Sequence, residues 1–315
     1  MNRVDVAVVG AGPAGIAAAW SAAETGASVL LVDEQPEIGG QLRWRVQPTI
    51  DIDIGLGIDP GPGPQVAGQI EHTLNALDSL TVRTETVAWG LFEDNLLGLS
   101  SSSGTDDVQA RSVIVASGST DIALPFPGWT LPGVLTARAV QIFMHVHRVL
   151  PGTNWAILGD TPESEELVTD LENAGASIVS RLGSEVDSIR ASGTNRLSYV
   201  EMGEEVIEVD GLALALGRQP DAELAQQAMA DMRFSIELGG FVPVTDESGQ
   251  TSLPNLFVIG DAAGIGTIPE LVAEGRLAGL TAAGARDQIV EQARSELHHK
   301  ANSERLLARA RLQTH

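Results

Sequence analysis

Three glycines near the start of the chain have the spacing of a site for a pyrophosphate. Gly10, Gly12 and Gly15 follow one apolar run, and two acids, Asp33 and Glu34, end the next one. A glycine at the second position lets a diphosphate approach the backbone, and the N–H groups that open the following helix face its negative charge. A carboxylate beyond the next strand accepts hydrogen bonds from ribose hydroxyls. The pattern therefore predicts an ADP-containing nucleotide, and it does not choose between the two acids.

Two later turns have residue types that suit the same ligand. Gly260 and Asp261 end a buried apolar run and precede an alanine-rich helix. A carboxylate there can accept a hydrogen bond from a flavin ribityl hydroxyl, while the helix N-terminus faces the pyrophosphate. The competing interpretation is a helix N-cap aspartate. Ala116, Ser117 and Gly118 close another apolar run, which predicts a second return of the chain to the nucleotide.

The residues around the first turn predict the elements that hold it in place. Residues 4–9 are apolar and β-branched, which indicates a buried parallel strand, and the alanine-rich run 14–25 predicts a helix. A second strand over 28–32 completes a strand–turn–helix–strand unit. Gly40 then allows the backbone to come close to whatever the first turn binds.

A second unit of the same kind follows over residues 155–180, but its glycine turn is altered. Thr161 and Ser164 stand where the second and third glycines would be. The turn and the start of the helix also carry four acids: Asp160, Glu163, Glu165 and Glu166. Negative charge at a helix N-terminus opposes the binding of phosphate. We therefore expect a Rossmann-like half that has lost ordinary NAD(P) binding and has a structural role.

Four other segments carry weaker predictions. We expect a loop over 43–64, which is either a surface excursion or a substrate-gating lid. Residues 81–87 predict a single strand. His145 and His147 stand two apart on a helix predicted over 134–149, so they do not share a face, and we expect surface histidines and not a metal pair. The charged run 287–312 predicts an amphipathic helix, which either docks a partner, caps the domain or forms a solvated tail, and we favour the tail.

The composition limits the partners and the chemistry. The 42 acidic residues outnumber the 19 basic ones, a net charge of −23, so nucleic acid and anionic membranes are not expected as partners. The chain has no cysteine, which excludes a redox-active disulfide, a thiolate nucleophile and a cysteine-ligated iron–sulfur cluster within it. The chain enters a strand directly and has no long apolar stretch, so we expect a cytoplasmic protein with no membrane span.

Four sequence motifs together resemble one branch of the flavoproteins that have two dinucleotide-binding domains. The motifs are Val32-Asp33-Glu34-Gln35-Pro36, Gly39-Gly40-Gln41, Gly260-Asp261-Ala262-Ala263-Gly264-Ile265-Gly266 and Ala273-Glu274-Gly275-Arg276-Leu277-Ala278-Gly279. They are similar to the nucleotide-binding subunits of heteromeric opine, hydroxyproline and dye-linked proline dehydrogenases. Subunits of hydrogen cyanide synthase and heterotetrameric sarcosine oxidase are also similar.

The resemblance implies an α/β, glutathione-reductase-like fold in which a second Rossmann-like domain is inserted in the first. We expect an FAD (ADP)-binding domain over 1–120 and 240–290, a second domain with a degenerate nucleotide motif over 121–239, and a C-terminal helix over 291–315. The expected cofactor-binding residues are Gly10, Gly12, Pro13, Ala14, Gly15, Asp33, Glu34, Gly40, Gln41, Val87, Ala116, Ser117, Gly118, Gly260 and Asp261. No catalytic residue and no metal ligand is assigned.

The resemblance also implies a function. It predicts a subunit of a flavin-dependent dehydrogenase or oxidase complex that oxidises an amino or imino acid of the opine or proline/hydroxyproline class. In this branch a partner flavoprotein usually oxidises the substrate, while the present subunit holds FAD and relays electrons. Three further features are left open: NAD or ATP/ADP at the same site, an FMN shared with the partner, and a small iron–sulfur subunit. Many members carry a cysteine-rich segment for a cluster, and this chain has none.

Two alternatives to this function remain open at the level of sequence. One is a stand-alone FAD-dependent NAD(P)H oxidoreductase, which the altered second glycine turn disfavours. The other is a non-catalytic scaffold subunit that holds ADP, ATP or NAD. All these ligands share the ADP moiety that the glycine pattern recognises, so the pattern does not separate them. A flavin released from the native protein would separate the enzymes from the scaffold.

Overall fold

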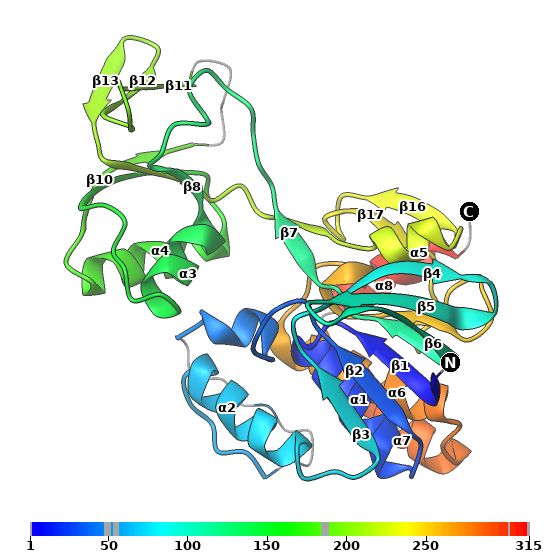
Figure 1. Ribbon diagram of the computed structural model, residues 1–315. Coiled ribbons are helices and arrows are strands. Elements are labelled where there is room, and N and C mark those ends of the chain that lie inside the picture. Colours follow the sequence, from blue (N-terminus) through cyan, green and yellow to red (C-terminus); the bar gives the residue numbers. More distant parts are fainter. Residues whose placement is uncertain (1, 47–51, 53–56, 184–188, 302, 314–315) are drawn as a thin grey trace. The chain divides into compact units, whose positions relative to one another are not determined.

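The computed structural model describes residues 2–46, 52, 57–183, 189–301 and 303–313 (Figure 1). Contacts within the chain divide it into two compact units: unit 1 is residues 1–42, 48–119 and 219–315, and unit 2 is residues 43–47 and 120–218. Residues 219–239, which the sequence-based boundary assigned to the second domain, lie in unit 1. Two stretches of the loop expected over 43–64, residues 47–51 and 53–56, are outside the described residues.

Unit 1 is built on a sheet with β1 at its centre. The strand order is β3-β2-β1-β6-β5-β4 within the described residues, and β18 also pairs with β6. β1 runs parallel to both β2 and β6, while β4 and β5 form an antiparallel extension. The strands are β1 (Asn2–Val9), β2 (Val29–Val32), β3 (Leu80–Arg83), β4 (Thr86–Phe92), β5 (Leu96–Ser101), β6 (Gly104–Val115) and β18 (Leu256–Val258).

Apolar side chains of β1 point alternately to two buried faces. Val6 and Val8 join the core under α1 and α6, whereas Ala7 and Val9 join the core under α5. Burial on both faces explains why the parallel strands are continuous apolar runs. The helices of unit 1 are α1 (Pro13–Glu24), α2 (Gly63–Leu74), α5 (Glu223–Gln227), α6 (Ile268–Ala283), α7 (Asp287–Lys300) and α8 (Ser303–Leu312), with short 3₁₀ turns η1 (Gly40–Arg43), η2 (Glu93–Asn95) and η3 (Gly260–Ala263).

Helices α1 and α6 touch through their backbones, because glycines of α6 meet alanines of α1. A Cβ added at Gly275 would lie 2.1 Å from the Ala14 carbonyl oxygen, and one added at Gly279 would lie 2.2 Å from the Ala18 carbonyl oxygen. Side chains on those two positions would push the helices apart. The motif Ala273–Gly279 is therefore explained by close packing of the helix that follows the Gly260 turn.

Replacing Gly275 with valine should lower the free energy of unfolding by about 3 kcal/mol, the upper range for overpacking a core, because the contact is with backbone that cannot rotate away. Urea unfolding followed by circular dichroism measures the change. Gly68 is the matched control, since it is an exposed helical glycine of α2 with open space at its Cβ position. Gly68→Ala should stabilise by about 0.5–1 kcal/mol. Equal stability of Gly275→Val and wild type would contradict this packing.

A small hairpin of unit 1 presents different chemistry on its two sides. In β16 (Met232–Ser235) and β17 (Gly240–Pro243), Phe234 and Phe241 are cross-strand partners with ring centroids 5.2 Å apart. Their side chains are 60% and 66% exposed. The other side of the hairpin is covered, because Leu238 and Val242 pack with Ala308 of α8. The C-terminal helix therefore forms part of the core of unit 1.

Unit 2 is a smaller Rossmann-like half. Its parallel sheet has the order β10-β9-β14-β8 within the described residues, and a separate antiparallel sheet has the order β11-β12-β13. The chain passes between the units along β7 (Ser119–Asp121) and β15 (Arg218–Pro220), which pair with each other. The elements of unit 2 are β8 (Val134–Thr136), α3 (Ala137–His145), β9 (Asn154–Leu158), α4 (Pro162–Asn173), β10 (Ser177–Leu182), β11 (Ile189–Ser192), β12 (Tyr199–Met202), β13 (Glu205–Glu208) and β14 (Gly211–Leu214).

Three sequence-based predictions of secondary structure are wrong in detail. The strand expected over 81–87 is two strands, β3 and β4, because Glu85 turns the chain with a positive φ of 49°. The helix that carries His145 starts only at Ala137, because Thr136 ends a strand and its side chain accepts a hydrogen bond from the N–H of Ala139. The run 287–312 is not one helix but two, α7 and α8. Across the described ranges, no helix combines the length and apolarity needed to cross a membrane.

Candidate functional site

The opening turn requires two of its three glycines for internal packing. A Cβ at Gly10 would lie 2.3 Å from the Ala116 carbonyl oxygen, and Gly10 has a positive φ of 100°. A Cβ at Gly15 would lie 1.9 Å from the Gly10 carbonyl oxygen. These positions are therefore closed to any side chain, whatever the turn binds. They bring β1, the first turn of α1 and the end of β6 together.

Gly12 differs, because no described protein atom lies within 4 Å of the position its Cβ would take. It is the N-cap residue of α1, and within the described part of the chain no side chain caps this helix start. Pro13 and Ala14 begin the helix, and its first turn has no acidic residue. Gly40 closes the same turn from another side, since a Cβ there would lie 2.8 Å from the Gly12 Cα. The residues present therefore fit an anion at Gly12.

The structure separates the two acids at the end of β2. The Asp33 carboxylate accepts hydrogen bonds from the N–H groups of Ala11 at 2.6 Å and Gln35 at 2.8 Å, and burial raises the pKa of Asp33. Glu34 is exposed and accepts a hydrogen bond from the Gln35 side chain at 3.2 Å. Asp33 thus ties β2 to the glycine turn, whereas the Glu34 carboxylate lies at the surface beside that turn.

The segments 39–41 and 86–87 are attached to the same turn by backbone hydrogen bonds. The N–H of Gly39 donates to the Ala11 carbonyl at 2.8 Å, which brings Gln41 of η1 close behind it. The N–H of Thr86 donates to the Asp33 carbonyl at 2.9 Å, and Val87 follows in β4 with 46% of its surface exposed. All of these sequence-predicted residues therefore belong to one region of unit 1.

The turn at 116–118 joins this region to the Gly260 turn. The Ser117 hydroxyl donates to the Asp221 carbonyl, so Ser117 already has a partner within the chain. Gly118 has a positive φ of 85°, which a larger residue rarely adopts. One residue later, the Ser119 hydroxyl donates to the Asp261 carboxylate at 3.2 Å. The two later turns that the sequence singles out therefore meet.

Asp261 is buried, and it is not the N-cap of the following helix. Its side chain accepts a hydrogen bond from the N–H of Gly266 at 3.0 Å, in addition to the one from Ser119. Helix α6 begins at Ile268, and Thr267 with Glu270 forms its capping box. The N-cap interpretation of Asp261 is therefore wrong. Gly260 packs against α1, because a Cβ there would lie 2.9 Å from the Ala14 Cβ.

A buried ion cluster behind the Gly260 turn was missed by sequence reasoning. Glu274 of α6 pairs with Arg305 and Arg309 of α8, and all three side chains are nearly inaccessible to water. Burial alone would raise the pKa of Glu274, but the two guanidinium groups outweigh it and the pKa lies below its ordinary value. The solvated-tail interpretation of the C-terminal run is therefore wrong. A glutamate inside an apolar helix, and arginines four apart on one helix face, were the available signals.

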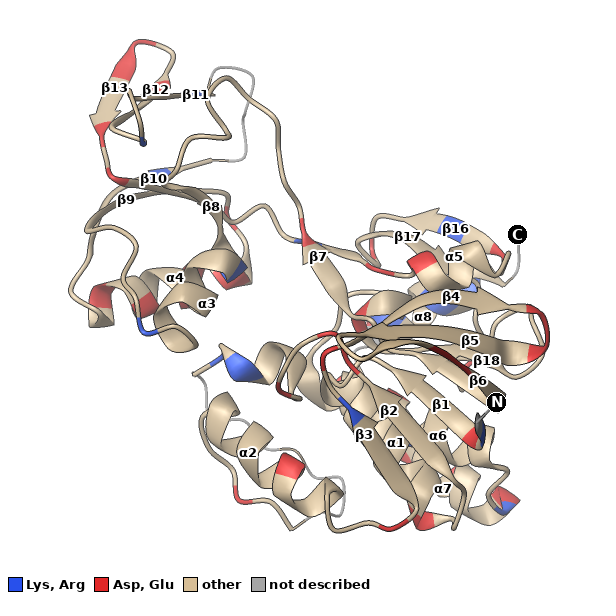
Figure 2. Ribbon diagram, in the orientation of Figure 1, with Lys and Arg blue, Asp and Glu red and all other residues tan. Residues whose placement is uncertain are grey.

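The glycine turn of unit 2 is filled by its own side chains. The Thr161 hydroxyl accepts a hydrogen bond from the N–H of Ser164 and donates to the Ala215 carbonyl, so the start of α4 is capped internally. Figure 2 shows acidic residues along this helix. They are paired with arginines of unit 2 as follows: Glu163 with Arg218, Glu165 with Arg181, and Glu166 with Arg45. A nucleotide phosphate would have to displace these groups.

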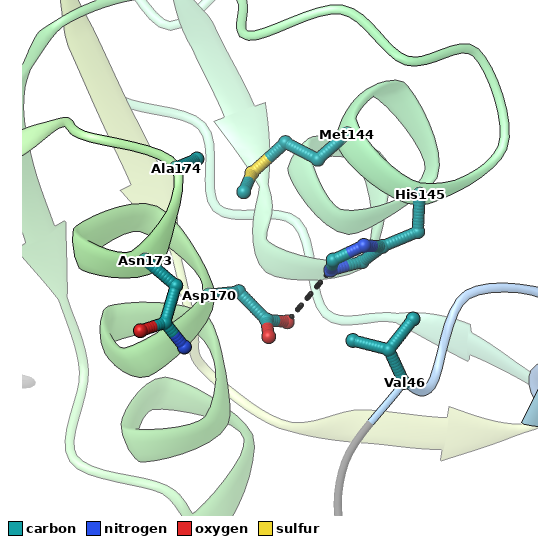
Figure 3. Close-up of a pocket in the computed structure, with 6 residues that line it drawn as sticks. All are labelled: Val46, Met144, His145, Asp170, Asn173 and Ala174. Carbon is teal, nitrogen blue, oxygen red and sulfur yellow. Dashed lines mark ion pairs between the residues drawn. The ribbon is translucent and has the colours of Figure 1, made fainter. Parts of the chain in front are cut away.

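A separate cavity of unit 2 corrects the prediction for His145, which is not a surface histidine (Figure 3). Its Nε2 lies 3.0 Å from the Asp170 carboxylate, and the two side chains are 13% and 7% exposed. Asp170 also accepts a hydrogen bond from the Gln141 amide at 3.1 Å. His147 lies beyond the end of α3 and is exposed. The cavity of about 260 Å³ is lined by Val46, Met144, His145, Asp170, Asn173 and Ala174.

Two family models match parts of the sequence. Residues 5–55 match the family described as FAD dependent oxidoreductase. Residues 157–279 match the family described as pyridine nucleotide-disulphide oxidoreductase. The first match covers the turn at Gly12 together with the acids that end β2. The second begins in β9 and ends in α6, so it includes the Gly260 turn.

Three kinds of curated relative are similar over most of the chain. An opine oxidase subunit of Rhizobium meliloti is 27% identical over 89% of this chain and 71% of that protein. The alpha subunit of sarcosine oxidase from Corynebacterium sp. is 27% identical over 90% of this chain and 33% of that protein. Hydrogen cyanide synthase subunit HcnB of Pseudomonas protegens is 24% identical over 96% of this chain and 74% of that protein. The resemblance inferred from the four motifs is confirmed.

Among solved structures, L-proline dehydrogenase from P. horikoshii is similar with a TM-score of 0.80 and 25% identity, over 95% of this chain and 59% of that one. Thioredoxin reductase from T. acidophilum has a TM-score of 0.66 with 18% identity, over 90% of this chain and 99% of that one. The chain thus spans about 59% of the length of the dehydrogenase and a third of the sarcosine oxidase subunit. The predicted fold, that of the FAD-dependent and pyridine nucleotide-disulphide oxidoreductases, is confirmed.

Proposed function

We propose that this chain is the FAD-holding subunit of a heteromeric dehydrogenase or oxidase that acts on an amino or imino acid. The observation that carries the proposal is the start of α1, which has no side-chain cap among the described residues and faces open space at Gly12. The match of residues 5–55 to the FAD dependent oxidoreductase family supports FAD as the ligand. The names of the relatives support an opine, sarcosine or proline-like substrate and a partner subunit.

Each part of the site has a role in this proposal. The N–H groups that open α1 at Gly12 bind the pyrophosphate, and Glu34 accepts hydrogen bonds from the adenosine ribose. Asp261 holds the Gly260 turn and accepts a hydrogen bond from a ribityl hydroxyl. When bound, FAD would supply an acceptor for the electrons that the partner subunit removes from the substrate. The remaining predicted residues, Pro13, Ala14, Gln41, Val87, Ala116, Ser117 and Gly118, shape the walls around these groups.

The proposal leaves the oxidation of the substrate to a partner flavoprotein. No general base for removing a substrate proton is assigned in this chain. We also propose that an FMN shared with the partner and a small iron–sulfur subunit carry the electrons onward. The proposed compartment is the cytoplasm. The test is mass spectrometry of the ligand released from native protein, which should be FAD. A nucleotide without an isoalloxazine ring would overturn the FAD assignment and favour the scaffold alternative.

The stand-alone NAD(P)H oxidoreductase is the second candidate, because residues 157–279 match the pyridine nucleotide-disulphide oxidoreductase family. The filled turn at Thr161 and the acid–arginine pairs of α4 argue against it. An anaerobic titration of the FAD-loaded chain with NADH and with NADPH decides between the candidates. We expect the flavin absorbance at 450 nm, about the usual flavin maximum, to remain unchanged. Bleaching at one equivalent of either coenzyme would favour the second candidate.

Replacing Glu34 with alanine should weaken ADP binding by about 10- to 100-fold, which corresponds to one hydrogen bond to a charged group. Stability should not change, because Glu34 is exposed. Asp33→Ala is the matched variant, and it should lower the free energy of unfolding by about 1–3 kcal/mol, because the buried N–H of Ala11 loses its acceptor. Calorimetric titration with ADP and urea unfolding give both quantities. The assignment of Glu34 fails if only Asp33→Ala loses ADP while remaining folded.

A further inference from the structure

Helix α8 contacts the turn that precedes α6 through the side chain of Arg305. The Arg305 Nη2 donates to the Gly264 carbonyl at 2.8 Å and to the Gly260 carbonyl at 3.2 Å, and its Nε donates to the Gly264 carbonyl at 3.2 Å. These carbonyls lie in an irregular, buried segment. Because a buried carbonyl without a donor is costly, Arg305 determines whether this backbone conformation is stable.

The space for the guanidinium is built into the turn. A Cβ at Gly266 would lie 3.0 Å from the Arg305 Nε, so a larger residue there would press on the guanidinium. Gly260 and Gly264 have positive φ angles of 70° and 129°, which glycine adopts readily and larger residues do not, so the path of the turn requires glycine at both positions. On the opposite side, the N–H of Gly260 donates to the Glu274 carboxylate at 3.1 Å. Gly260 is therefore held at both backbone groups: its N–H donates to Glu274, and its carbonyl accepts from Arg305.

We propose that Arg305, with Glu274 as its counter-charge, is a positioning residue for the flavin half of the cofactor. The inference rests on the proposed function, because it takes the Gly260 turn as the part of the site that meets the flavin. Arg305 does not touch the ligand. It donates to the carbonyls of the turn, which holds the backbone on both sides of Asp261 and so keeps the Asp261 carboxylate beside Ser119. Retention of FAD therefore depends on the docking of α8.

Arg309 provides a control within the same helix. It pairs with Glu274 as Arg305 does, but its Nη2 donates to the Thr245 hydroxyl at 2.7 Å and to the Asp246 carbonyl at 3.2 Å. Among the described residues, Arg309 makes no hydrogen bond to the Gly260 turn. Arg305→Met and Arg309→Met thus each remove one buried guanidinium from Glu274, and only the first removes donors from the turn.

The experiment compares FAD with ADP, which lacks the ribityl and isoalloxazine groups. The wild type, Arg305→Met and Arg309→Met are stripped of ligand, and both dissociation constants are measured by calorimetry, with thermal stability recorded for each variant. For Arg305→Met, the dissociation constant of FAD should rise by about 10- to 100-fold, by analogy with the loss of a group that orients the ligands of a bound metal. Its dissociation constant for ADP should be unchanged. Arg309→Met should bind both ligands as the wild type does.

A second variant covers the case in which Arg305→Met does not fold. Arg305→Lys keeps the charge beside Glu274 but cannot reach two carbonyls and a carboxylate with one ammonium group, so the loss of FAD affinity should be smaller but measurable. The visible circular dichroism of bound FAD should change in this variant and not in Arg309→Lys. Equal effects of the Arg305 and Arg309 variants, or equal loss of FAD and ADP, would overturn the positioning role alone. A wild type that binds ADP but not FAD would overturn the proposed function, and this inference with it.

Discussion

Replacing Gly12 with alanine should leave the protein folded and remove its ability to retain a dinucleotide. The added Cβ meets no described protein atom within 4 Å, and the backbone of Gly12 has a φ of −77° that alanine adopts readily. The cost in stability should be about 1 kcal/mol or less, the preference of an N-cap for glycine over alanine. The methyl group instead occupies the approach of the pyrophosphate. Loss of two charged hydrogen bonds to the start of α1 corresponds to at least about 100-fold in affinity.

Calorimetric titration with ADP and FAD measures this loss, and urea unfolding verifies the fold. Gly15→Ala is the matched control, because its Cβ would lie 1.9 Å from the Gly10 carbonyl oxygen. Gly15→Ala should therefore lower the free energy of unfolding, whereas Gly12→Ala should lower ligand affinity and leave the free energy of unfolding nearly unchanged. An unchanged affinity of folded Gly12→Ala for both ligands would mean that the ADP moiety does not lie across the first turn.

Replacing Glu274 with glutamine should be the most destabilising single change in the C-terminal part of unit 1. It leaves the guanidinium groups of Arg305 and Arg309 buried without their counter-charge. Removal of one partner from a buried ion pair costs about 3–5 kcal/mol. Urea unfolding at neutral pH measures the loss. Glu247→Gln is the surface control, since Glu247 is half exposed in its pair with Arg294, and it should change stability by about 1 kcal/mol at most.

The same carboxylate gives the wild type a characteristic pH dependence. Burial alone would raise the pKa of Glu274, yet Arg305 and Arg309 lower it below the ordinary 4.5 in the folded protein. The stabilisation is therefore fully present above about pH 4.5 and is lost as the pH falls through the lower, folded-state pKa. In Glu274→Gln this part of the acid transition should be absent. A variant with the same stability and the same acid transition as the wild type would contradict the role of the cluster.

The parts of the site that sequence predicted are those set by local backbone geometry. The turns at Gly12 and Gly260 are recognisable because a positive φ, a close approach or an exposed helix start demands glycine at a fixed offset from an apolar strand. The acids at 33 and 34 could not be separated, because adjacent residues at a strand end point to different sides and only the fold decides which one reaches Ala11.

The burial of the C-terminal helices and of His145 could not be predicted from the sequence. Helix α8 has the charged composition of a solvent-exposed helix, and its burial depends on Glu274, a partner 31 residues away from Arg305. Likewise His145 meets Asp170 of another helix, which spacing within α3 cannot reveal. In the second unit, the sequence indicated repulsion of phosphate by four acids, whereas three of these acids are paired with distant arginines. Long-range pairing of charges is not encoded in any local pattern.

Unit 1 is assembled from separate stretches of the chain, and this sets an order for folding during synthesis. The first strand and α1 leave the ribosome early, but the glycine face of α6 that covers Ala14 and Ala18 is translated only after the whole of unit 2. At about 5–20 residues per second, the apolar face of α1 waits on the order of ten seconds or more for its cover. Residues 120–218 form most of unit 2 and are contiguous, so we expect unit 2 to complete its fold before unit 1.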